Sequence, residues 1–172
     1  EFPYRERRWL IHTGEEAKEH GENYTFVWTD TKPKHESGLR YEAEKADFNK
    51  SQSEVEHYFG ASEQAFLKLG EGSEGINWTV KVDEQASYSF GFVFASAQQG
   101  KTSMELWVND QKIIDSLDFP ETRPLFTGWD IVKINANLKA GENRISLKSR
   151  GLNRLNVDYL WVPEAAPEQV VR

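Results

Sequence analysis

The sequence predicts an all-β fold, an antiparallel β-sandwich with a short irregular N-terminal extension. Three observations support this prediction. Short segments alternate large apolar residues with small or polar ones, turn-forming residues separate these segments, and no segment shows the apolar periodicity of a long helix. Regularly spaced short strands with turns between them are typical of antiparallel sandwiches.

The first 38 residues differ from the rest, because they are polar and charged with scattered aromatic side chains. Residues 15–20 predict one or two helical turns. Residues 24–28 predict a short strand, since they are rich in aromatic and β-branched side chains, and residues 31–34 read as a linker. We interpret residues 1–38 as an extension, a linker or the remnant of a preceding domain, and the sequence leaves these alternatives open.

Residues 39–163 are predicted to form the sandwich, and residues 164–172 a frayed tail. In residues 87–94 four large aromatic residues occur at every second position, which places all of them on one buried strand face. Asn109 and Asp110 predict a tight turn because both residue types tolerate positive φ. Further strands are predicted at residues 78–82, 104–109, 131–138, 145–147 and 156–162.

The composition excludes several classes of function. The formal net charge of −7 argues against general binding of nucleic acids or anionic membranes, which requires a basic surface. Cysteine is absent, which excludes disulfides, thiolate catalysis and zinc–thiolate sites. No apolar run is long enough to span a membrane and no signal peptide is recognisable, so we expect a processed or excised segment in which Glu1 and Phe2 are compatible with a cloning scar.

Two carboxylates near the start of the predicted sandwich are candidate metal ligands. On a strand, Glu42 and Glu44 would point to the same face, about 7 Å apart, and would repel each other unless a cation neutralised them. Calcium would do so, because it binds six to eight oxygen ligands, carboxylates among them. A solvated polar face and the acid–base pair of a glycosidase are the alternatives.

A third carboxylate, Asp158, is embedded among apolar residues of the last predicted strand. Burying it would be costly unless it were paired or bound to a metal. If the first and last strands of the sandwich are neighbours, Asp158 could complete a site with Glu42 and Glu44. The alternative is a strand-end aspartate that faces solvent.

Aromatic residues outside the strand patterns are candidates for stacking on sugar rings. Trp129 follows the loop-like stretch 120–128, and Tyr58 with Phe59 directly precedes Gly60. At a loop tip such side chains could stack on a sugar face, and the alternative is a lid over the core. The tryptophans inside strand patterns are predicted to be core residues: Trp78, Trp107 and Trp161.

Catalytic motifs are not recognisable in the sequence. There is no nucleophile elbow, phosphate-binding loop, HExxH motif or EF-hand loop. The four histidines are dispersed, at positions 12, 20, 35 and 57.

Taken together, a series of short motifs resembles carbohydrate-binding modules of families 35 and 6. The order and spacing of these motifs are more specific than any one of them, and the resemblance covers about residues 39–163. The matching segments are Tyr41-Glu42-Ala43-Glu44, Gly60-Ala61-Ser62, Ala65-Phe66-Leu67, Ile76-Asn77-Trp78-Thr79-Val80, Leu106-Trp107-Val108-Asn109, Thr127-Gly128-Trp129, residues 138–143 and Asn156-Val157-Asp158-Tyr159-Leu160.

The resemblance implies a β-jelly roll attached to a glycoside hydrolase, lyase or esterase of a secreted, cell-surface or periplasmic bacterial protein. It also implies a structural calcium near the paired glutamates and the late aspartate, Glu42, Glu44 and Asp158. Sugar is expected in loops at one end of the sandwich, and carried over by position this implies Trp129, Asn156, Tyr58 and Asn153. Some relatives bind sugar on a concave sheet face instead.

This sequence departs from the family pattern at three places. Val132 stands where a second tryptophan is common, residues 123–126 read as a loop insertion, and Glu63 stands where glycine is common. Three hypotheses therefore remain open. The chain is a module that binds a plant or algal polysaccharide, or a structural sandwich packed on a catalytic domain without sugar binding, or a small enzyme that uses Glu42 and Glu44.

Overall fold

The computed structural model describes residues 10–11, 26–27, 37–58, 60–70, 75–96, 100–122, 128–149, 151 and 155–164. The chain divides into two units, Glu1–Thr31 and Lys32–Arg172. In the first unit, β1 (Leu10–Ile11) pairs antiparallel with β2 (Phe26–Val27), inside the strand predicted at 24–28. The helical turns predicted at 15–20, the linker at 31–34 and most of the tail lie outside the described residues.

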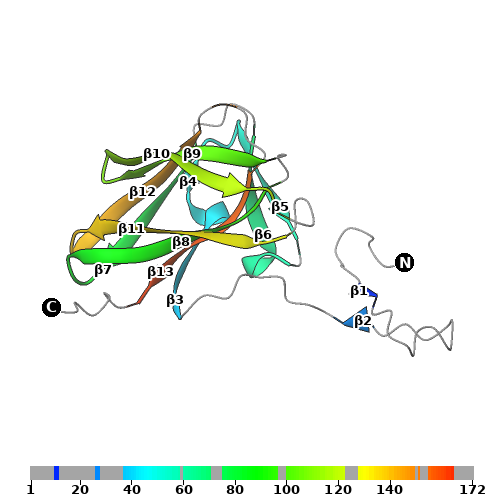
Figure 1. Cartoon of the computed structure of the whole chain (residues 1–172), viewed down its shortest axis with the longest axis horizontal. Helices are drawn as coiled ribbons and strands as arrows, with labels where there is room; N and C mark the ends of the chain where they lie inside the picture. Colours follow the sequence, from blue (N-terminus) through cyan, green and yellow to red (C-terminus); the bar gives the residue numbers. More distant parts are fainter. Residues whose placement is uncertain are drawn as a thin grey trace. The chain divides into compact units, whose positions relative to one another are not determined.

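The second unit consists of two antiparallel sheets, which confirms the predicted β-sandwich (Figure 1). One sheet has the strand order β10-β9-β12-β7-β4. The other has the order β11-β8-β13-β6-β5, with β3 paired to β13. The strands are β3 (Gly38–Glu42), β4 (Asp47–Phe48), β5 (Ser53–His57), β6 (Ala65–Leu69), β7 (Ile76–Val82), β8 (Ala86–Ser96), β9 (Lys101–Val108), β10 (Gln111–Pro120), β11 (Asp130–Leu138), β12 (Gly141–Ser149) and β13 (Leu155–Pro163).

The first and last strands of this unit are neighbours. β3 pairs antiparallel with β13, and Glu42 lies opposite Tyr159. Two short 3-10 helices lie near this pair, η1 (Ala43–Lys45) directly after β3 and η2 (Ser62–Gln64) directly before β6. The described residues include no helix that is long and apolar enough to cross a membrane.

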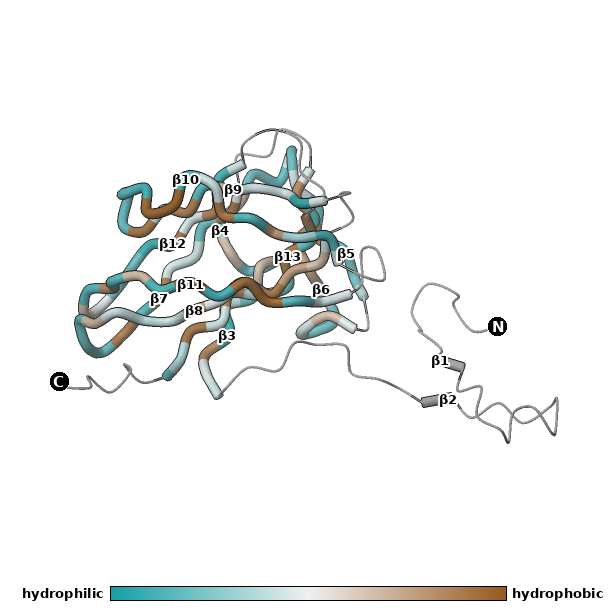
Figure 2. Tube along the Cα trace, in the orientation of Figure 1, coloured by the Kyte–Doolittle hydropathy of each residue, from teal (hydrophilic) through white to brown (hydrophobic). Residues whose placement is uncertain are grey.

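The main core lies between the two sheets. Phe90, Phe92 and Phe94 of β8 are fully buried there, as the alternation in residues 87–94 predicts. Phe94 packs edge-on against Phe119 of β10, with ring centroids 5.0 Å apart, so the aromatic rings join the two sheets. Along the strands, hydrophilic and hydrophobic residues replace one another at short intervals, as expected for faces that alternate between core and surface (Figure 2).

A second apolar cluster covers the outer face of the six-stranded sheet. Strand alternation turns Val93 and Ala95 of β8, and Tyr159 and Trp161 of β13, away from the main core, yet all four are at most 2% exposed. The central part of this sheet, β13 and the second half of β8, is therefore buried on both faces. The second cluster comprises Ala61, Phe66, Val93, Ala95, Trp129, Tyr159 and Trp161, with Tyr58 and Ile131 packed against it.

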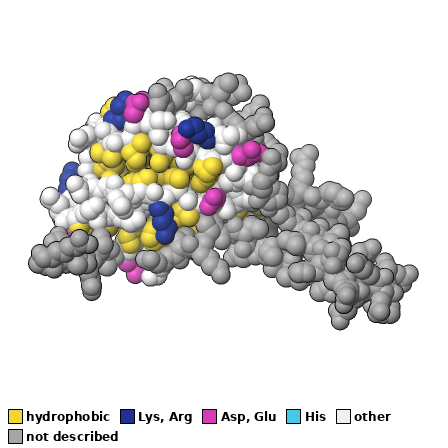
Figure 3. Space-filling view, viewed as in Figure 1, with side chains coloured by type: hydrophobic (Ala, Val, Ile, Leu, Met, Phe, Trp, Pro, Cys, Tyr) yellow, Lys and Arg dark blue, Asp and Glu magenta, His cyan; other side chains and the backbone are white. Residues whose placement is uncertain are grey.

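β10 is an edge strand of the five-stranded sheet and β11 is an edge strand of the other sheet, and apolar side chains of both are incompletely covered. Ile114 of β10 and Val132 and Ile134 of β11 are only half-buried there, and Ile113 is 41% exposed. Figure 3 shows hydrophobic side chains in a band across this side of the molecule. The pairing of β10 with β9 shifts register twice, which makes β10 irregular. An irregular edge strand disfavours pairing with a strand of another molecule.

Candidate functional site

The paired glutamates lie on two different elements. β3 ends at Glu42, and Ala43 begins η1, so Glu44 lies in a 3-10 helix. The expectation that both side chains point from one strand face is therefore wrong. The extended backbone does not continue past Glu42, because Ala43, fully buried in the main core, already begins η1.

Ser62 links the carboxylates of the first and last strands. Its backbone N–H donates to Oδ1 of Asp158 at 2.8 Å, and its hydroxyl donates to Oε1 of Glu42 at 2.9 Å. Asp158 is fully buried and Glu42 is 7% exposed, so the alternative of a solvent-facing aspartate is wrong. Asp158 sits at a register shift between Val157 and Tyr159 in the pairing of β13 with β8.

The electrostatics of this cluster favour a cation. Burial raises the pKa of Glu42, and the charges of Glu44 and Glu63 raise it further, against the lowering by the Ser62 hydrogen bond and Lys45. Burial also raises the pKa of Glu44. Within the described part of the chain, Oε2 of Glu42 and Oε2 of Glu44 are buried and have no hydrogen-bond partner. Two orphaned carboxylate oxygens fit a hard cation that prefers oxygen ligands.

The three side chains do not form a complete coordination sphere by themselves. Among the described residues, no group of three histidine, aspartate or glutamate side chains converges closely enough to hold a metal ion. Calcium takes backbone carbonyl oxygens and water as well as carboxylates. Glu42, Glu44 and Asp158 would therefore supply only part of its six to eight ligands.

Trp129 is a buried residue. It precedes β11, is 5% exposed, and packs edge-on against Phe66 with ring centroids 5.6 Å apart. The expectation of an aromatic exposed at a loop tip is therefore wrong, and the alternative of a lid over apolar residues describes its position. The cause is the second cluster on the outer sheet face, which Trp129 helps to cover.

The other residues expected to bind sugar lie near the same cluster. Tyr58 is partly exposed, packs against the cluster, and its ring leaves no room for a Cβ on Gly60. Asn156 lies on β13 and is 4% exposed. Phe59 and Asn153 lie outside the described residues. The structure thus brings Tyr58 and Trp129 to one cluster, but it leaves only the tyrosine accessible.

Trp107 is the aromatic residue that the sequence prediction placed wrongly in the core. On β9 the buried positions are Met104, Leu106 and Val108, so alternation turns Trp107 outward, where it is partly exposed. The alternation of these residues was visible in the sequence. It is a stronger signal than the general tendency of tryptophan toward burial.

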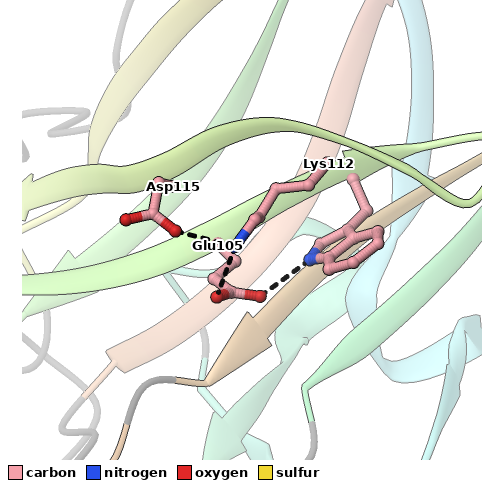
Figure 4. Close-up of polar contacts among 4 residues, drawn as sticks. Glu105, Lys112 and Asp115 are labelled. Atoms are coloured by element: carbon pink, nitrogen blue, oxygen red, sulfur yellow. Dashed lines mark hydrogen bonds and ion pairs between the residues drawn. The ribbon is translucent and has the colours of Figure 1, made fainter.

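A polar network fixes the orientation of the Trp107 ring (Figure 4). The indole N–H donates to Oε2 of Glu105 at 2.9 Å. This hydrogen bond is the main cause of the lowered pKa of Glu105. Nζ of Lys112 donates to Oε1 of Glu105 at 3.3 Å and to Oδ1 of Asp115 at 2.8 Å. Nζ of Lys148 lies 3.8 Å from the centroid of the ring, in a cation–π contact.

The family of the chain follows from a comparison with family models. The model of carbohydrate binding module family 6 matches residues 42–164, which is more than half of the chain. The chain belongs to this family. A search of the curated proteins found no match.

Solved structures of family 35 carbohydrate binding modules resemble this module. It is similar to the native family 35 carbohydrate binding module from Clostridium thermocellum, at 28% identity and a TM-score of 0.68, with 76% of this chain and 100% of that chain covered. The family 35 module from Paenibacillus barcinonensis is 22% identical with a TM-score of 0.66, and 74% of this chain and 100% of that chain are covered. At 22% identity, the likeness to the second module shows the fold alone.

The module also matches parts of longer enzyme chains. A GH26-CBM35 β-(1,4)-mannanase from Podospora anserina is 20% identical with a TM-score of 0.61, and the match covers 77% of this chain and 29% of the enzyme. An exo-β-1,3-galactanase from Phanerochaete chrysosporium is 22% identical with a TM-score of 0.63, covering 81% of this chain and 30% of the enzyme. The chain therefore shares its fold with parts of these longer enzyme chains.

Proposed function

We propose that this module is non-catalytic and holds a secreted polysaccharide-degrading enzyme on its substrate. Membership of family 6 supports a binding role, and the matches to parts of enzyme chains support a catalytic domain elsewhere in the parent polypeptide. The polysaccharide would be of plant or algal origin. Neither nucleic acid nor a membrane is proposed as a partner, in keeping with the net charge of −7.

The observation that carries the proposal is Trp107 on the outer face of the five-stranded sheet. An indole ring has flat apolar faces on which a sugar ring can stack, and its N–H is already satisfied by Glu105. Nζ of Lys148 lies 3.8 Å and Nζ of Lys112 5.8 Å from the ring centroid, so a stacking sugar would displace one of these ammonium groups. The network of Glu105, Lys112 and Asp115 holds the ring in place before a ligand arrives, which reduces the entropy lost on binding. Ser146 lies opposite Trp107 on β12, and Lys148 is two residues further along the same strand.

The loop end of the sandwich is the second candidate surface. There, Tyr58 would stack on the sugar, and Asn156 and Asn153 would provide hydrogen bonds, as the family resemblance implies. Trp129 would support this surface from below, because it is buried beneath it in the second cluster. We give the sheet face priority because Trp107 is accessible, whereas Asn156 and Trp129 are buried.

Calcium at Glu42, Glu44 and Asp158 is proposed as a structural cofactor that ties β3 to β13. The orphaned oxygens of the two glutamates and the Ser62 bridge to Asp158 support it. A ligand that binds only the folded state stabilises it by mass action, by about 2.7 kcal/mol at a hundredfold excess over Kd. Adding EDTA should therefore lower the Tm, and restoring calcium should recover it. An identical Tm in both buffers would contradict the calcium proposal.

The binding proposal is tested by affinity electrophoresis of the whole chain through gels that contain neutral or uronic-acid polysaccharides, with mannan and β-1,3-galactan in the panel. We expect retardation by at least one polysaccharide, with a Kd in the micromolar to millimolar range, about −8 to −4 kcal/mol. Each gel is run with calcium and with EDTA, and bovine serum albumin serves as the non-binding reference. A folded chain that no polysaccharide retards would favour the structural sandwich without sugar binding.

A further inference from the structure

The free edge of β11 is regular. β11 ends the strand order of the six-stranded sheet, and among the described strands it pairs with β8 alone. All nine of its residues, Asp130–Leu138, pair with β8 without a register shift. β10, the edge strand of the other sheet, shifts register twice. A regular edge strand presents a row of backbone N–H and C=O groups with which another strand can pair.

The lysine of β11 does not guard this edge. Lys133 lies opposite Gly91 of β8, and Gly91 lies opposite Trp161 of β13. Nζ of Lys133 is 4.9 Å from the centroid of the Trp161 ring. A Cβ on Gly91 would lie 3.2 Å from Cγ of Lys133. The lysine side chain therefore crosses Gly91 toward the middle of the sheet, whereas a lysine that prevents pairing keeps its charge at the edge.

The other side chains of this edge are uncharged or apolar. Val132 and Ile134 pack against the main core but are only half-buried. Asn135 and Asn137, on the opposite face, are exposed amides. Within residues 131–137 only the lysine is charged. A further strand along this edge would therefore cover the half-buried apolar side chains without burying an unpaired charge.

We propose that two copies of this chain form a dimer by antiparallel pairing of β11 with β11 across a twofold axis. Ile134 is the middle residue of β11, so all nine residues pair only when the axis passes through Ile134. Val132 then lies opposite Ala136 of the second copy, and Lys133 lies opposite Asn135. A register centred on Lys133 instead would place two lysines opposite each other, and facing like charges destabilise a strand pair.

The dimer goes beyond the proposed sugar binding and carries two copies of the face with Trp107. Because a polysaccharide repeats its binding unit, a polymer that engages both copies is held more tightly, with no new contact at either site. The dimer itself does not require sugar, so it is tested in the absence of polysaccharide. Its failure would leave the proposed function intact.

Sedimentation velocity of the whole chain, from low micromolar to millimolar concentration, tests the dimer. We expect a monomer–dimer equilibrium with a Kd of about 10–100 μM, because one pair of strands is a small interface. Asn135→Lys adds a charge at an exposed position of the edge and should raise the Kd about tenfold, with an unchanged Tm. Gln111→Lys, the same change at an exposed position of β10, is the matched control and should keep the Kd of the wild type.

A cysteine cross-link tests the register, and the absence of cysteine from the chain makes the result specific. Facing residues of antiparallel strands have Cα atoms about 4.5–5.5 Å apart, which a disulfide can bridge. Oxidation with copper phenanthroline should therefore join Ile134→Cys into a covalent dimer. Ile113→Cys is the control on β10, where Ile113 is 41% exposed, and should form much less dimer. A wild type that is monomeric at every concentration, or equal cross-linking of the two cysteine variants, would overturn the proposal.

Discussion

The two outer faces of the sandwich differ in what they do with tryptophan. On the six-stranded sheet, Trp161 and Trp129 are at most 5% exposed and belong to the second apolar cluster. On the five-stranded sheet, Trp107 is partly exposed and surrounded by charged residues. The first face therefore contributes to stability, and the second is available for a ligand.

The sequence pattern of a single strand already reflects this difference. In β13 every residue from Leu155 to Val162 is buried, a continuous pattern expected of a strand covered on both faces. In β9 buried and accessible residues alternate, as expected of a strand with one free face. The cover on β13 is provided in part by cations, since Arg40 lies 5.1 Å from the ring centroid of Tyr159 and Lys133 lies 4.9 Å from that of Trp161.

The largest expected effect is that of Trp161→Ala on stability. Removing a fully buried indole leaves a cavity on the outer face, and such truncations cost about 3–5 kcal/mol. The free energy of unfolding, measured by urea denaturation, should fall by this amount. Trp107→Ala is the matched control on the other face, with an expected loss below about 1 kcal/mol. Equal losses for both variants would show that the two faces do not differ.

An intermediate effect is expected from Gly38→Ala. A Cβ on Gly38 would lie 2.2 Å from Nε1 of Trp161 and 2.6 Å from the carbonyl oxygen of Val162. Since backbone atoms cannot give way easily, we expect a loss of about 1–3 kcal/mol, the usual cost of overpacking. At Gly91 the clash is with the flexible side chain of Ile131, at 2.8 Å, so Gly91→Ala should cost less. Thermal melts that rank the two variants in the opposite order would show that Trp161 is not held as tightly as described.

The smallest expected effect is on the pH dependence of thermal stability, through the buried carboxyl of Glu42. Burial raises the pKa of Glu42 in the folded state above its ordinary value of 4.5. The folded state therefore holds this proton more strongly than the unfolded state, so the stabilisation is complete below about pH 4.5 and is lost as pH rises through the folded pKa. In EDTA, the Tm of Glu42→Gln minus that of the wild type should increase from pH 4.5 to pH 7. Parallel curves over this range would contradict the burial of an ionisable Glu42.

Much of the fold could be predicted from local pattern, because β7, β8, β9, β11 and β13 keep a regular alternation or a continuous apolar run. β10 was not predicted, since its two register shifts break the period of two. The exposure of an aromatic residue depends on what covers it, so the second cluster and the burial of Trp129 could not be derived from local sequence.

The candidate cation site was predicted in part. The neighbouring positions of β3 and β13 were a condition of that prediction, and the structure fulfils it. Ser62 was missed as a link because its partner Asp158 is 96 residues away in the chain. The predicted place of Glu44 was wrong because the strand ends at Glu42 and a 3-10 helix begins at Ala43. Glu63, which departs from the family pattern, has a left-handed backbone with φ of 44°, a conformation that glycine adopts more freely.

The central claim is that the face carrying Trp107 binds the polysaccharide and contributes little to stability. The most direct measurement is affinity electrophoresis of Trp107→Ala and Tyr58→Ala in the polysaccharide that retards the wild type, with a melting curve of each variant. We expect Trp107→Ala to lose retardation with a Tm close to that of the wild type, and Tyr58→Ala to retain most of it. Full retardation of Trp107→Ala, with loss in Tyr58→Ala, would contradict the claim and assign binding to the loop end.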